Sequence, residues 1–392
     1  MGTKQYDSAT DLITFSRASS ATFLGSNGLL QTAANNIPRI EYDATGAVKG
    51  LLIEEARTNN LKSSGDLNGS GWVAAATIGT LTAGSPFGTY QTISPAYNST
   101  GIGPAQRYQI GRAITSGATY VAWSLVKYSA GSGWFIVNPY DTTSGNKRAY
   151  FDVQNGVVGV KDATLLDHGM VDYGDGWWLC WVSANAASTS GGVSCEAPNG
   201  DGVLSCTASD VILIAGTQFE QGSFPTSYIP TTSAAATRAK DVASIPVSAF
   251  GYNNDKGSLV IDVLTPVVDQ FMTLAYFNTN SYFNSRGLLK ANTNTASSGN
   301  HYINATYDGA SIKLQLGTQT QAGYTKLGLS YGATARAVRD GGTVVSGDSR
   351  SPSPTRLHLG GRDNGFQSQC WIKSIQYYPR QLTDTQLQEL TT

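Results

Sequence analysis

The 392-residue chain has few charged residues and few of the residue types that most often carry out chemistry. Charged residues make up 14% of the sequence, there are three histidines, and six of the 27 acidic residues are glutamates. The formal net charge is −1, and no long run of either sign occurs. Because nucleic-acid-binding proteins carry a basic patch or stripe, this composition predicts a protein without a nucleic-acid partner.

Long hydrophobic runs are missing as well. No segment approaches the roughly 18 consecutive apolar residues that a membrane-spanning helix needs. The N-terminal sequence MGTKQYDSAT lacks the apolar core of a signal peptide. Tyr6 stands where a myristoylation site needs Ser or Thr. These absences predict a protein that is made in the cytoplasm and is not embedded in a membrane.

The four cysteines show no CxxC spacing, so they do not suggest a metal or redox motif. Cys180 and Cys370 each adjoin a tryptophan in an apolar run, which favours buried thiols. Cys195 and Cys206 flank a loop rich in Gly, Asn and Asp and could pair if oxidised. The sequence leaves that pairing open.

Glycine and aromatic residues are abundant, with 44 Gly, 20 Tyr and 7 Trp. This composition favours strands and turns over helices. Apolar runs recur at short intervals and are separated by Gly, Asn, Asp and Ser, which is typical of an all-β sandwich or barrel. Strands are expected within 119–128, 133–140, 148–160, 176–184, 210–220, 257–266, 311–319 and 355–361.

Two further segments indicate how the chain is organised. The sequence PTTSAAATRAK at 230–240 is small and polar without strand periodicity, so a linker is expected at 231–250. Near the C-terminus, Thr383 and Gln386 have the spacing of a capping box, and Leu382 and Leu387 stand at the hydrophobic-staple positions. This pattern predicts a short helix at about 383–391.

The stretch KGLLIEEARTNNL at 49–61 places two glutamates and an arginine behind an apolar run. Glycoside hydrolysis needs two carboxylates that face each other across the scissile bond. In a strand, Glu54 and Glu55 would point to opposite faces. In a helix, Glu54 and Arg57 would pair at i, i+3. Neither arrangement gives an acid/base pair, so Glu54, Glu55 and Arg57 are interpreted as structural ion pairs.

No other catalytic pattern emerges. No two glutamates have the spacing of two or four that places the acids of sandwich-fold glycosidases on one strand face. No histidine has a second ligand at metal spacing, and HExxH, GxSxG and Walker motifs are absent. The chain is therefore expected not to be an enzyme and to have no cofactor. An aspartate-based hydrolase or lyase stays open, because aspartates are scattered over many loops.

Sugar recognition is the chemistry for which the residues can be argued. Aromatic faces pack on the C–H faces of sugar rings, although large aromatic residues more often fill a core. Five tryptophans inside predicted strands are expected to pack, namely Trp123, Trp177, Trp178, Trp181 and Trp371. The candidates for ligand contact adjoin Gly-rich or Pro turns, or form a polar turn after two glycines that could also bind Ca²⁺ or be plainly solvated. These are Trp72, Trp134, Tyr140, Arg362, Asp363 and Asn364.

The N-terminal sequence resembles a known cassette. FSRASSATFLGSNGLLQTAANNIPRIEYD at 15–43, followed by KGLLIEEARTNNL, is similar to the N-terminal cassette of bacteriophage and prophage virion proteins of the tail-fibre, head-fibre or minor structural type. The resemblance implies that residues 1–62 attach the protein to other virion proteins. Arg17, in the first block, would then be a structural residue together with Glu54, Glu55 and Arg57.

Two later regions resemble sandwich domains. YVAWSLVKYSAG, YFDVQNGVVG, DYGDGWWLCWVS and GTQFEQGSFPTSYIPTTSAAATRAKDV resemble the carbohydrate-binding-module-like jelly roll that follows this cassette. RLHLGGRDNGFQSQCWIKSIQYYPRQLTDTQLQEL at 356–390 is similar to the end of a concanavalin A-like or laminin G-like sandwich, with a bulge expected between Ile372 and Ile375. The expected fold is all-β, with two tandem β-sandwich (jelly-roll) domains at 63–230 and 251–392.

This resemblance implies a structural protein on the tail or capsid surface of a phage virion. The leading hypothesis is a tail-fibre or receptor-binding protein that recognises host polysaccharide or lipopolysaccharide. Such fibres are usually homotrimers, and multivalency strengthens weak sugar contacts. The alternatives are a capsid decoration, collar or baseplate protein without glycan binding, and a capsule depolymerase.

Overall fold

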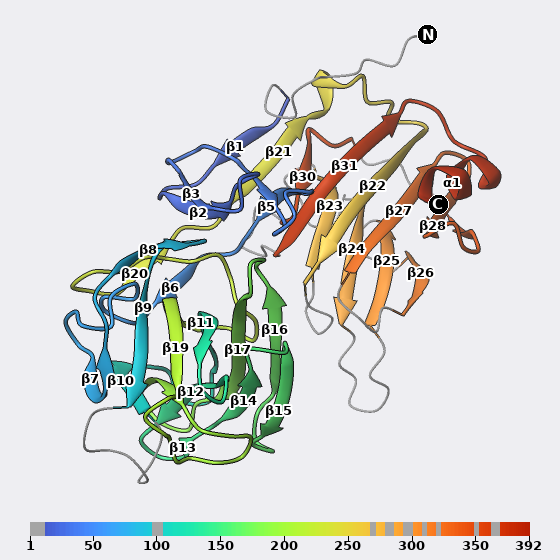
Figure 1. The fold of residues 1–392 in the computed structure, drawn as a ribbon. Coiled ribbons are helices and arrows are strands. Elements are labelled where there is room, and N and C mark those ends of the chain that lie inside the picture. Colours follow the sequence, from blue (N-terminus) through green and yellow to red (C-terminus); the bar gives the residue numbers. More distant parts are fainter. Residues whose placement is uncertain are drawn as a thin grey trace.

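The computed structural model describes residues 12–95, 105–266, 272–278, 286–292, 301–307, 312–318, 323–348, 353–361 and 369–392. These residues form two β-sandwiches, with the N-terminal strands gathered where the sandwiches meet (Figure 1). Within the described ranges, α1 (Asp384–Thr391) is the only α-helix. The predicted all-β fold class is therefore confirmed.

The first sandwich is a jelly roll of antiparallel strands. Its strands are β7 (Val73–Ile78), β8 (Thr82–Ser85), β9 (Gly88–Pro95), β10 (Ala105–Ala113), β11 (Thr119–Ala130), β12 (Trp134–Asp141), β13 (Gly145–Asn146), β14 (Ala149–Asp152), β15 (Val157–Lys161), β16 (Asp167–Asp172), β17 (Trp177–Asn185), β18 (Ser190–Ala197) and β19 (Val211–Gln221). One layer has the order β15-β14-β12-β18-β10, and the other has the order β9-β19-β11-β17-β16. β7 pairs with both β10 and β9, so it joins the two layers at one edge.

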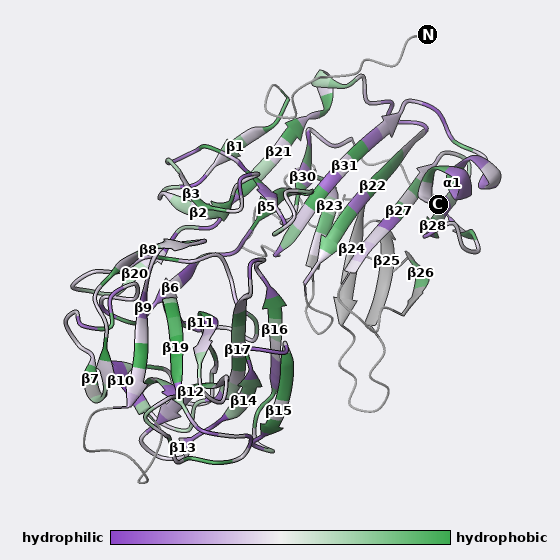
Figure 2. Cartoon of the chain, in the orientation of Figure 1, coloured by the Kyte–Doolittle hydropathy of each residue, from purple (hydrophilic) through white to green (hydrophobic). Residues whose placement is uncertain are grey.

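Alternate side chains of these strands build the first core, because successive residues of a strand point to opposite faces. Tyr120, Ala122 and Val126 of β11 meet Phe135 and Val137 of β12 between the layers. The opposite face of the second layer is also covered. A further apolar cluster lies there, and Figure 2 shows apolar residues along much of β19 beside it. Its members are Trp123, Leu125, Trp177, Leu179, Ala215 and Tyr228, with Leu30 and Phe87 packed against them.

In the described residues, the second sandwich has two layers of seven strands each. Its strands are β1 (Thr14–Ser16), β4 (Arg39–Tyr42), β5 (Val48–Ile53), β21 (Val242–Pro246), β22 (Gly257–Thr265), β23 (Met272–Asn278), β24 (Arg286–Asn292), β25 (His301–Tyr307), β26 (Ile312–Thr318), β27 (Gly323–Tyr331), β28 (Ala335–Arg339), β29 (Val345–Gly347), β30 (Arg356–Leu359) and β31 (Cys370–Tyr378). The layers run β1-β21-β30-β23-β24-β25-β26 and β29-β28-β27-β22-β31-β5-β4. Leu259, Ile261 and Val263 of β22 lie in the core between them.

Four short elements complete the described chain: β2 (Ala21–Leu24), β3 (Leu30–Ala33), β6 (Arg57–Asn59) and β20 (Ala236–Arg238). β2 pairs with β3, and β6 pairs with β20. A 3-10 turn, η2 (Val247–Ala249), follows β21. β6 and β20 lie in the two connections between the sandwiches, whereas β2, β3 and η2 lie between strands of the second sandwich.

The domain boundaries differ from those expected from the sequence. Within the expected segment 1–62, the described strands β1 and β5 are not separate from the second sandwich, because β1 pairs with β21 and β5 pairs with β31. Both layers of the second sandwich therefore include N-terminal strands. Residues 231–250 are not a linker, because β20, β21 and η2 lie within them. An unpaired edge of β31 would expose a row of backbone donors and acceptors, and the apolar run of β5 covers that edge.

Several local predictions are confirmed. Thr383 caps α1 with both hydrogen bonds of the capping box, and Leu382 and Leu387 are buried beside the helix. The register between β22 and β31 shifts so that Asp262 faces Ser374 and Val263 faces Ile372, which is the expected bulge. The four cysteines are buried, and none of them forms a disulfide bond.

Candidate functional site

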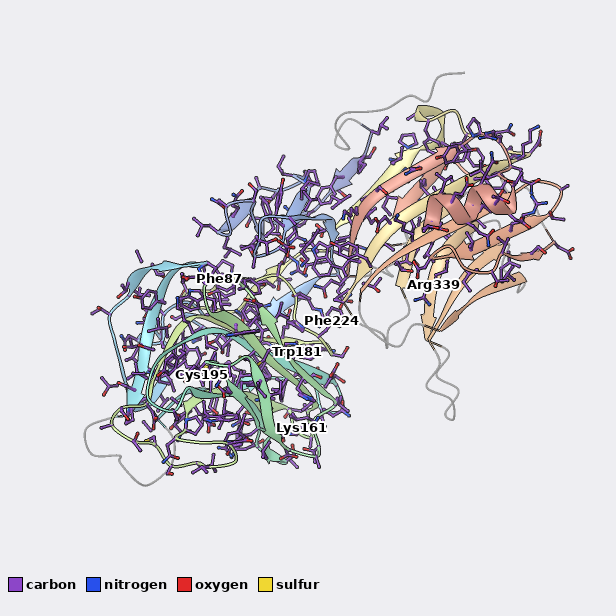
Figure 3. The ribbon with its side chains drawn as sticks, turned by 45° about the vertical axis from the view of Figure 1, so that its right-hand side comes forward. Phe87, Lys161, Trp181, Cys195, Phe224 and Arg339 are labelled. Carbon is purple, nitrogen blue, oxygen red and sulfur yellow. The ribbon has the colours of Figure 1, made fainter. Side chains whose placement is uncertain are left out.

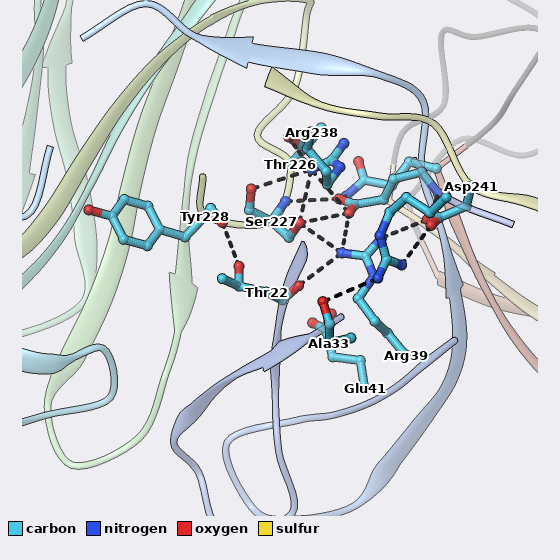
Figure 4. A network of polar contacts seen from close by, with 12 residues as sticks. Thr22, Ala33, Arg39, Glu41, Thr226, Ser227, Tyr228, Arg238 and Asp241 are labelled. Atoms are coloured by element: carbon cyan, nitrogen blue, oxygen red, sulfur yellow. Dashed lines mark hydrogen bonds and ion pairs between the residues drawn. The ribbon is translucent and has the colours of Figure 1, made fainter. Parts of the chain in front are cut away.

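Five charged side chains are buried together where the N-terminal strands meet the segment after β19 (Figure 4). Arg39 lies 2.8 Å from a carboxylate oxygen of Glu54 and 2.6 Å from one of Asp241. Arg17 contacts Asp241 at 3.1 Å, and Arg238 contacts Glu54 at 3.1 Å. None of these side chains is more than 1% exposed. We call these five residues the buried charge network.

Hydrogen bonds fix the two carboxylates of this network. The backbone N–H and the hydroxyl of Ser227 donate to Glu54 at 2.8 and 2.7 Å. The backbone N–H of Glu54 donates to Asp241 at 2.9 Å. Burial by itself would raise the pKa of Glu54, but Arg238, Arg39 and Ser227 lower it to about 2. Glu54 is therefore ionised at neutral pH and is not a proton donor there.

Glu55 and Arg57 form a separate contact. Arg57 pairs with the Glu55 carboxylate, donates to the Gln221 carbonyl, and lies over the Phe224 ring at 4.9 Å from its centroid. Gly222, with φ of +146°, leaves room for this guanidinium, which would collide with an added Cβ. Glu54 and Glu55 thus serve two different ion pairs and do not form an opposed acid/base pair.

A cleft of about 400 Å³ lies beside the buried charge network. Its walls come from the N-terminal strands, from the β16–β17 edge of the first sandwich and from the beginning of β31. Figure 3 labels three of its aromatic residues, Phe87, Trp181 and Phe224, which come from the turn before β9, from β17 and from the segment after β19. The volume lies within the range of small-molecule sites.

One wall of the cleft is formed by Gln369 and Trp371, each of which has a buried polar atom without a partner among the described residues. Cys370 points into the core of the second sandwich, so its neighbours Gln369 and Trp371 point to the other face. Their side chains are 4% and 6% exposed. Gln369 donates its amide N–H to Glu54 at 3.4 Å. Its Oε1 and the Nε1 of Trp371 have no hydrogen-bond partner among the described residues.

These two atoms indicate a place for a polar group. Leaving a buried donor or acceptor unsatisfied costs about 1–3 kcal/mol. Gln369 supplies an acceptor and Trp371 supplies a donor on the same wall. A polar group that comes within hydrogen-bond distance of either atom would satisfy it.

A β-bulge brings a cation to the same wall. The register between β4 and β5 shifts so that Glu41 faces Gly50 and Tyr42 faces Val48, which leaves Lys49 without a partner in the ladder. The ammonium group of Lys49 lies 3.2 Å from the Glu41 carboxylate and 3.7 Å from the centroid of a Trp371 ring. The cation at this wall is therefore already paired.

The opposite wall offers aromatic surface and a neutral hydroxyl. Trp181 is half-buried, and Tyr173 lies just beyond β16. Burial raises the pKa of Tyr173, and the carboxylates of Glu41 and Glu54 raise it further. Tyr173 is therefore protonated at neutral pH and can act as a hydrogen-bond donor.

The ligand contacts predicted from the sequence lie elsewhere. Trp72 is 8% exposed and belongs to the first core, and its Nε1 donates to the Ser63 carbonyl at 3.0 Å. Its ring is thus not available to a ligand, which corrects that prediction. Trp134 and Tyr140 are half-buried on the outer face of β12, away from the cleft, and their role stays a prediction. Arg362, Asp363 and Asn364 lie outside the described residues.

Sequence reasoning missed the cleft, because Trp181 and Trp371 were assigned to packing. The available signal was the order Gln369-Cys370-Trp371, where an apolar residue between two polar ones predicts that the outer two share a face. Among the described residues, no His, Cys, Asp and Glu side chains cluster to hold a metal ion. Nor does any helix in these ranges have the length and apolarity to cross a membrane.

No protein-family model matches the sequence, and no curated protein matches it significantly. Among solved structures, the CBM40 domain of a Ruminococcus gnavus sialidase bound to α2,3-sialyllactose is 13% identical, with a TM-score of 0.30 over 37% of this chain and 87% of that chain. Trypanosoma rangeli sialidase is 11% identical, with a TM-score of 0.30 over 96% and 76%. Mouse laminin α1 domains LG4-5 are 9% identical, with a TM-score of 0.22 over 70% and 90%.

Similarity at this level carries no argument about function. The chain is placed by its own architecture in the class of antiparallel β-sandwich proteins. Its function has to be argued from the cleft.

Proposed function

We propose that this protein recognises glycans and that the cleft beside the buried charge network is its sugar-binding site. The observation that carries this proposal is that Gln369 Oε1 and Trp371 Nε1 have no hydrogen-bond partner in the part of the chain that the structure describes. A sugar hydroxyl is both donor and acceptor, so it can accept from Trp371 and donate to Gln369. An apolar ligand would leave both atoms unsatisfied.

The other walls of the cleft support the same kind of ligand. Trp181 and Tyr173 supply aromatic surface on which the C–H face of a sugar ring can pack. The combination of aromatic walls with a few placed polar atoms is typical of small-molecule sites. We propose binding without cleavage, since the adjacent Glu54 is ionised, is held by two arginines and offers no proton to a leaving group.

We further propose that the protein acts on the surface of a phage virion, as a tail-fibre or receptor-binding protein directed at host polysaccharide or lipopolysaccharide. The support is the resemblance of residues 15–61 and 216–242 to phage virion proteins. A homotrimer would present three clefts at once, and multivalency would strengthen weak sugar binding. Blocking of phage adsorption by the purified protein tests this assignment, and absence of any block would contradict it.

The cleft itself is tested by sugar binding. A glycan array with the full chain should identify a ligand, and calorimetry should then compare variants. Trp371→Phe removes the donor but keeps an aromatic ring, and the loss of one neutral hydrogen bond, about 0.5–1.5 kcal/mol, predicts roughly two- to tenfold weaker binding. Trp181→Ala should also weaken binding, since it removes a wall of the cleft.

Trp134→Phe is the matched control, because Trp134 is half-buried on the first sandwich but outside the cleft. It should bind as the unaltered protein does. If Trp134→Phe abolished binding while folded Trp371→Phe and Trp181→Ala did not, the site would be the outer face of β12 instead. If the folded protein bound no glycan on the array, the proposed function would be wrong.

A further inference from the structure

The charges around the cleft are unevenly balanced. Lys49 is paired with Glu41 and lies over Trp371. Glu54 is neutralised from behind by Arg39 and Arg238. Asp167, at the beginning of β16, is exposed at the cleft and forms no ion pair with any described residue. Asp167 is therefore the carboxylate of the cleft wall that is left without an ion-pair partner among the described residues. The excess positive charge of the buried charge network, three arginines against two carboxylates, lies behind Glu54 and is buried.

The direction of the Gln369 amide is fixed as well. Its N–H group donates to the Glu54 carboxylate, so a flipped amide would place its oxygen against that carboxylate. The atom left for a ligand is consequently an acceptor, which requires a donor from the ligand. An ionised carboxylate has no proton to donate. Bound near Trp371 Nε1, it would leave Gln369 Oε1 unsatisfied.

From these two observations we infer that the cleft selects uncharged sugars and discriminates against acidic ones, an inference that rests on the proposed glycan-binding function. The ligand class is a neutral hexose or an N-acetylhexosamine. Sugar hydroxyls can donate to Gln369 and accept from Trp371. An N-acetyl group matches them equally well, because its N–H can donate to Gln369 and its carbonyl can accept from Trp371.

The cleft would reject an acidic sugar in two ways, by repulsion from Asp167 and by leaving the Gln369 Oε1 acceptor without a donor. Specific sites commonly reject close analogues in this manner. A sugar carboxylate in the cleft would be repelled by the negative charge of Asp167, which is exposed at the cleft wall. Lys49 could neutralise the sugar carboxylate only by giving up its ion pair with Glu41. We expect acidic sugars to bind at least about tenfold more weakly than their neutral counterparts.

The test uses the full chain and a glycan array of matched neutral and acidic pairs, with lactose and α2,3-sialyllactose among them, followed by calorimetry on the best pair. The neutral member should bind more tightly. Asp167→Asn keeps a side-chain oxygen that can accept the hydrogen bond from the backbone N–H of His168. This substitution should reduce the difference in affinity between the neutral and the acidic sugar severalfold. Asp172→Asn is the matched control, since Asp172 is an exposed carboxylate at the other end of β16 and outside the cleft.

Each outcome separates the two proposals. The inference is supported if the neutral sugar binds more tightly than its acidic counterpart, and if Asp167→Asn reduces this difference in affinity while Asp172→Asn leaves it unchanged. The inference would be overturned if the acidic sugar bound as tightly as the neutral one or more tightly, and if this binding were lost in Lys49→Met. Glycan recognition itself would then stay in place. A gap that Asp167→Asn leaves unchanged would overturn the role given to Asp167. No binding of either member of any pair would overturn the proposed function itself.

Discussion

Replacing Glu54 by glutamine should strongly destabilise the protein. The substitution keeps the shape of the side chain but removes a carboxylate that pairs with Arg39 and Arg238 inside the buried charge network. Asp241 would then be the remaining carboxylate among three arginine side chains, counting Arg17. Breaking a buried ion pair on one side costs about 3–5 kcal/mol, because it leaves a buried charge without compensation.

The magnitude can be translated into a melting temperature. For a domain of about 150–250 residues, 1 kcal/mol shifts Tm by roughly 2–4 °C, so Glu54→Gln should lower the Tm of the sandwich that contains it by roughly 6–20 °C. Calorimetry of the full chain measures this shift. Glu55→Gln is a matched neighbour, because Glu55 is 32% exposed and Arg57 keeps its hydrogen bond to the Gln221 carbonyl. The loss of Tm should therefore be clearly smaller than that of Glu54→Gln.

The comparison of the two adjacent glutamates tests whether the buried charge network stabilises the fold. Equal Tm values for Glu54→Gln and Glu55→Gln would refute the claim that the buried charge network stabilises the fold. A large loss for Glu54→Gln alone would show that the two glutamates of the EEAR stretch have different surroundings, as their contacts indicate.

Two further predictions concern acid and a glycine. The pKa of Glu54 is about 2 in the folded protein and about 4.3 in an unfolded chain, so its stabilisation is complete above about pH 5 and is lost as the pH falls toward 2. The urea midpoints of the unaltered protein and of Glu54→Gln should therefore draw together as the pH falls from 5 to 2, and a constant difference over this range would contradict this. Gly50→Ala should cost at least about 2 kcal/mol by urea denaturation, since its φ is +132° and the new Cβ would lie 2.5 Å from the Ile372 carbonyl oxygen. Gly323→Ala, with open space around the site, is the control and should unfold at the same urea concentration as the unaltered protein.

The elements that could be predicted from the sequence are those with a local cause. Alternating apolar residues predicted β11, β12 and β17, and the Thr383 capping box predicted α1. The odd spacing of Ile372 and Ile375 predicted a bulge, because one flat strand cannot turn both inward. In each case the signal lies within a few residues of the structure that it specifies.

The pairing of distant segments could not be predicted in this way. The KGLLI run indicates a buried strand, but nothing in it specifies β31 as its neighbour. β20 and β21 are short and rich in small residues, so they looked like a linker. Three buried arginines contradict the usual exposure of that residue type and become intelligible only with their carboxylates in place.

The candidate site was missed for a related reason. A tryptophan inside a strand is usually a packing residue, and Trp371 is indeed nearly buried. What distinguishes it is a donor without a partner, and this can be recognised only when every neighbouring atom is known. Trp72 shows the converse, since its place beside a Gly-rich turn suggested exposure but its indole is held in the core.

The pairing of β5 with β31 has a consequence for synthesis of the protein. The first sandwich is inserted into the sequence of the second. β5 and β31, which pair in one sheet of the second sandwich, therefore lie near opposite ends of the chain. A ribosome that has made Val48–Ile53 must translate almost all of the remaining protein before Cys370–Tyr378 emerges to receive it. The inserted jelly roll can fold during that interval, whereas the enclosing sandwich completes its sheet only at the end. Premature termination would therefore leave a folded jelly roll attached to unpaired N-terminal strands, the kind of exposed edge that promotes aggregation.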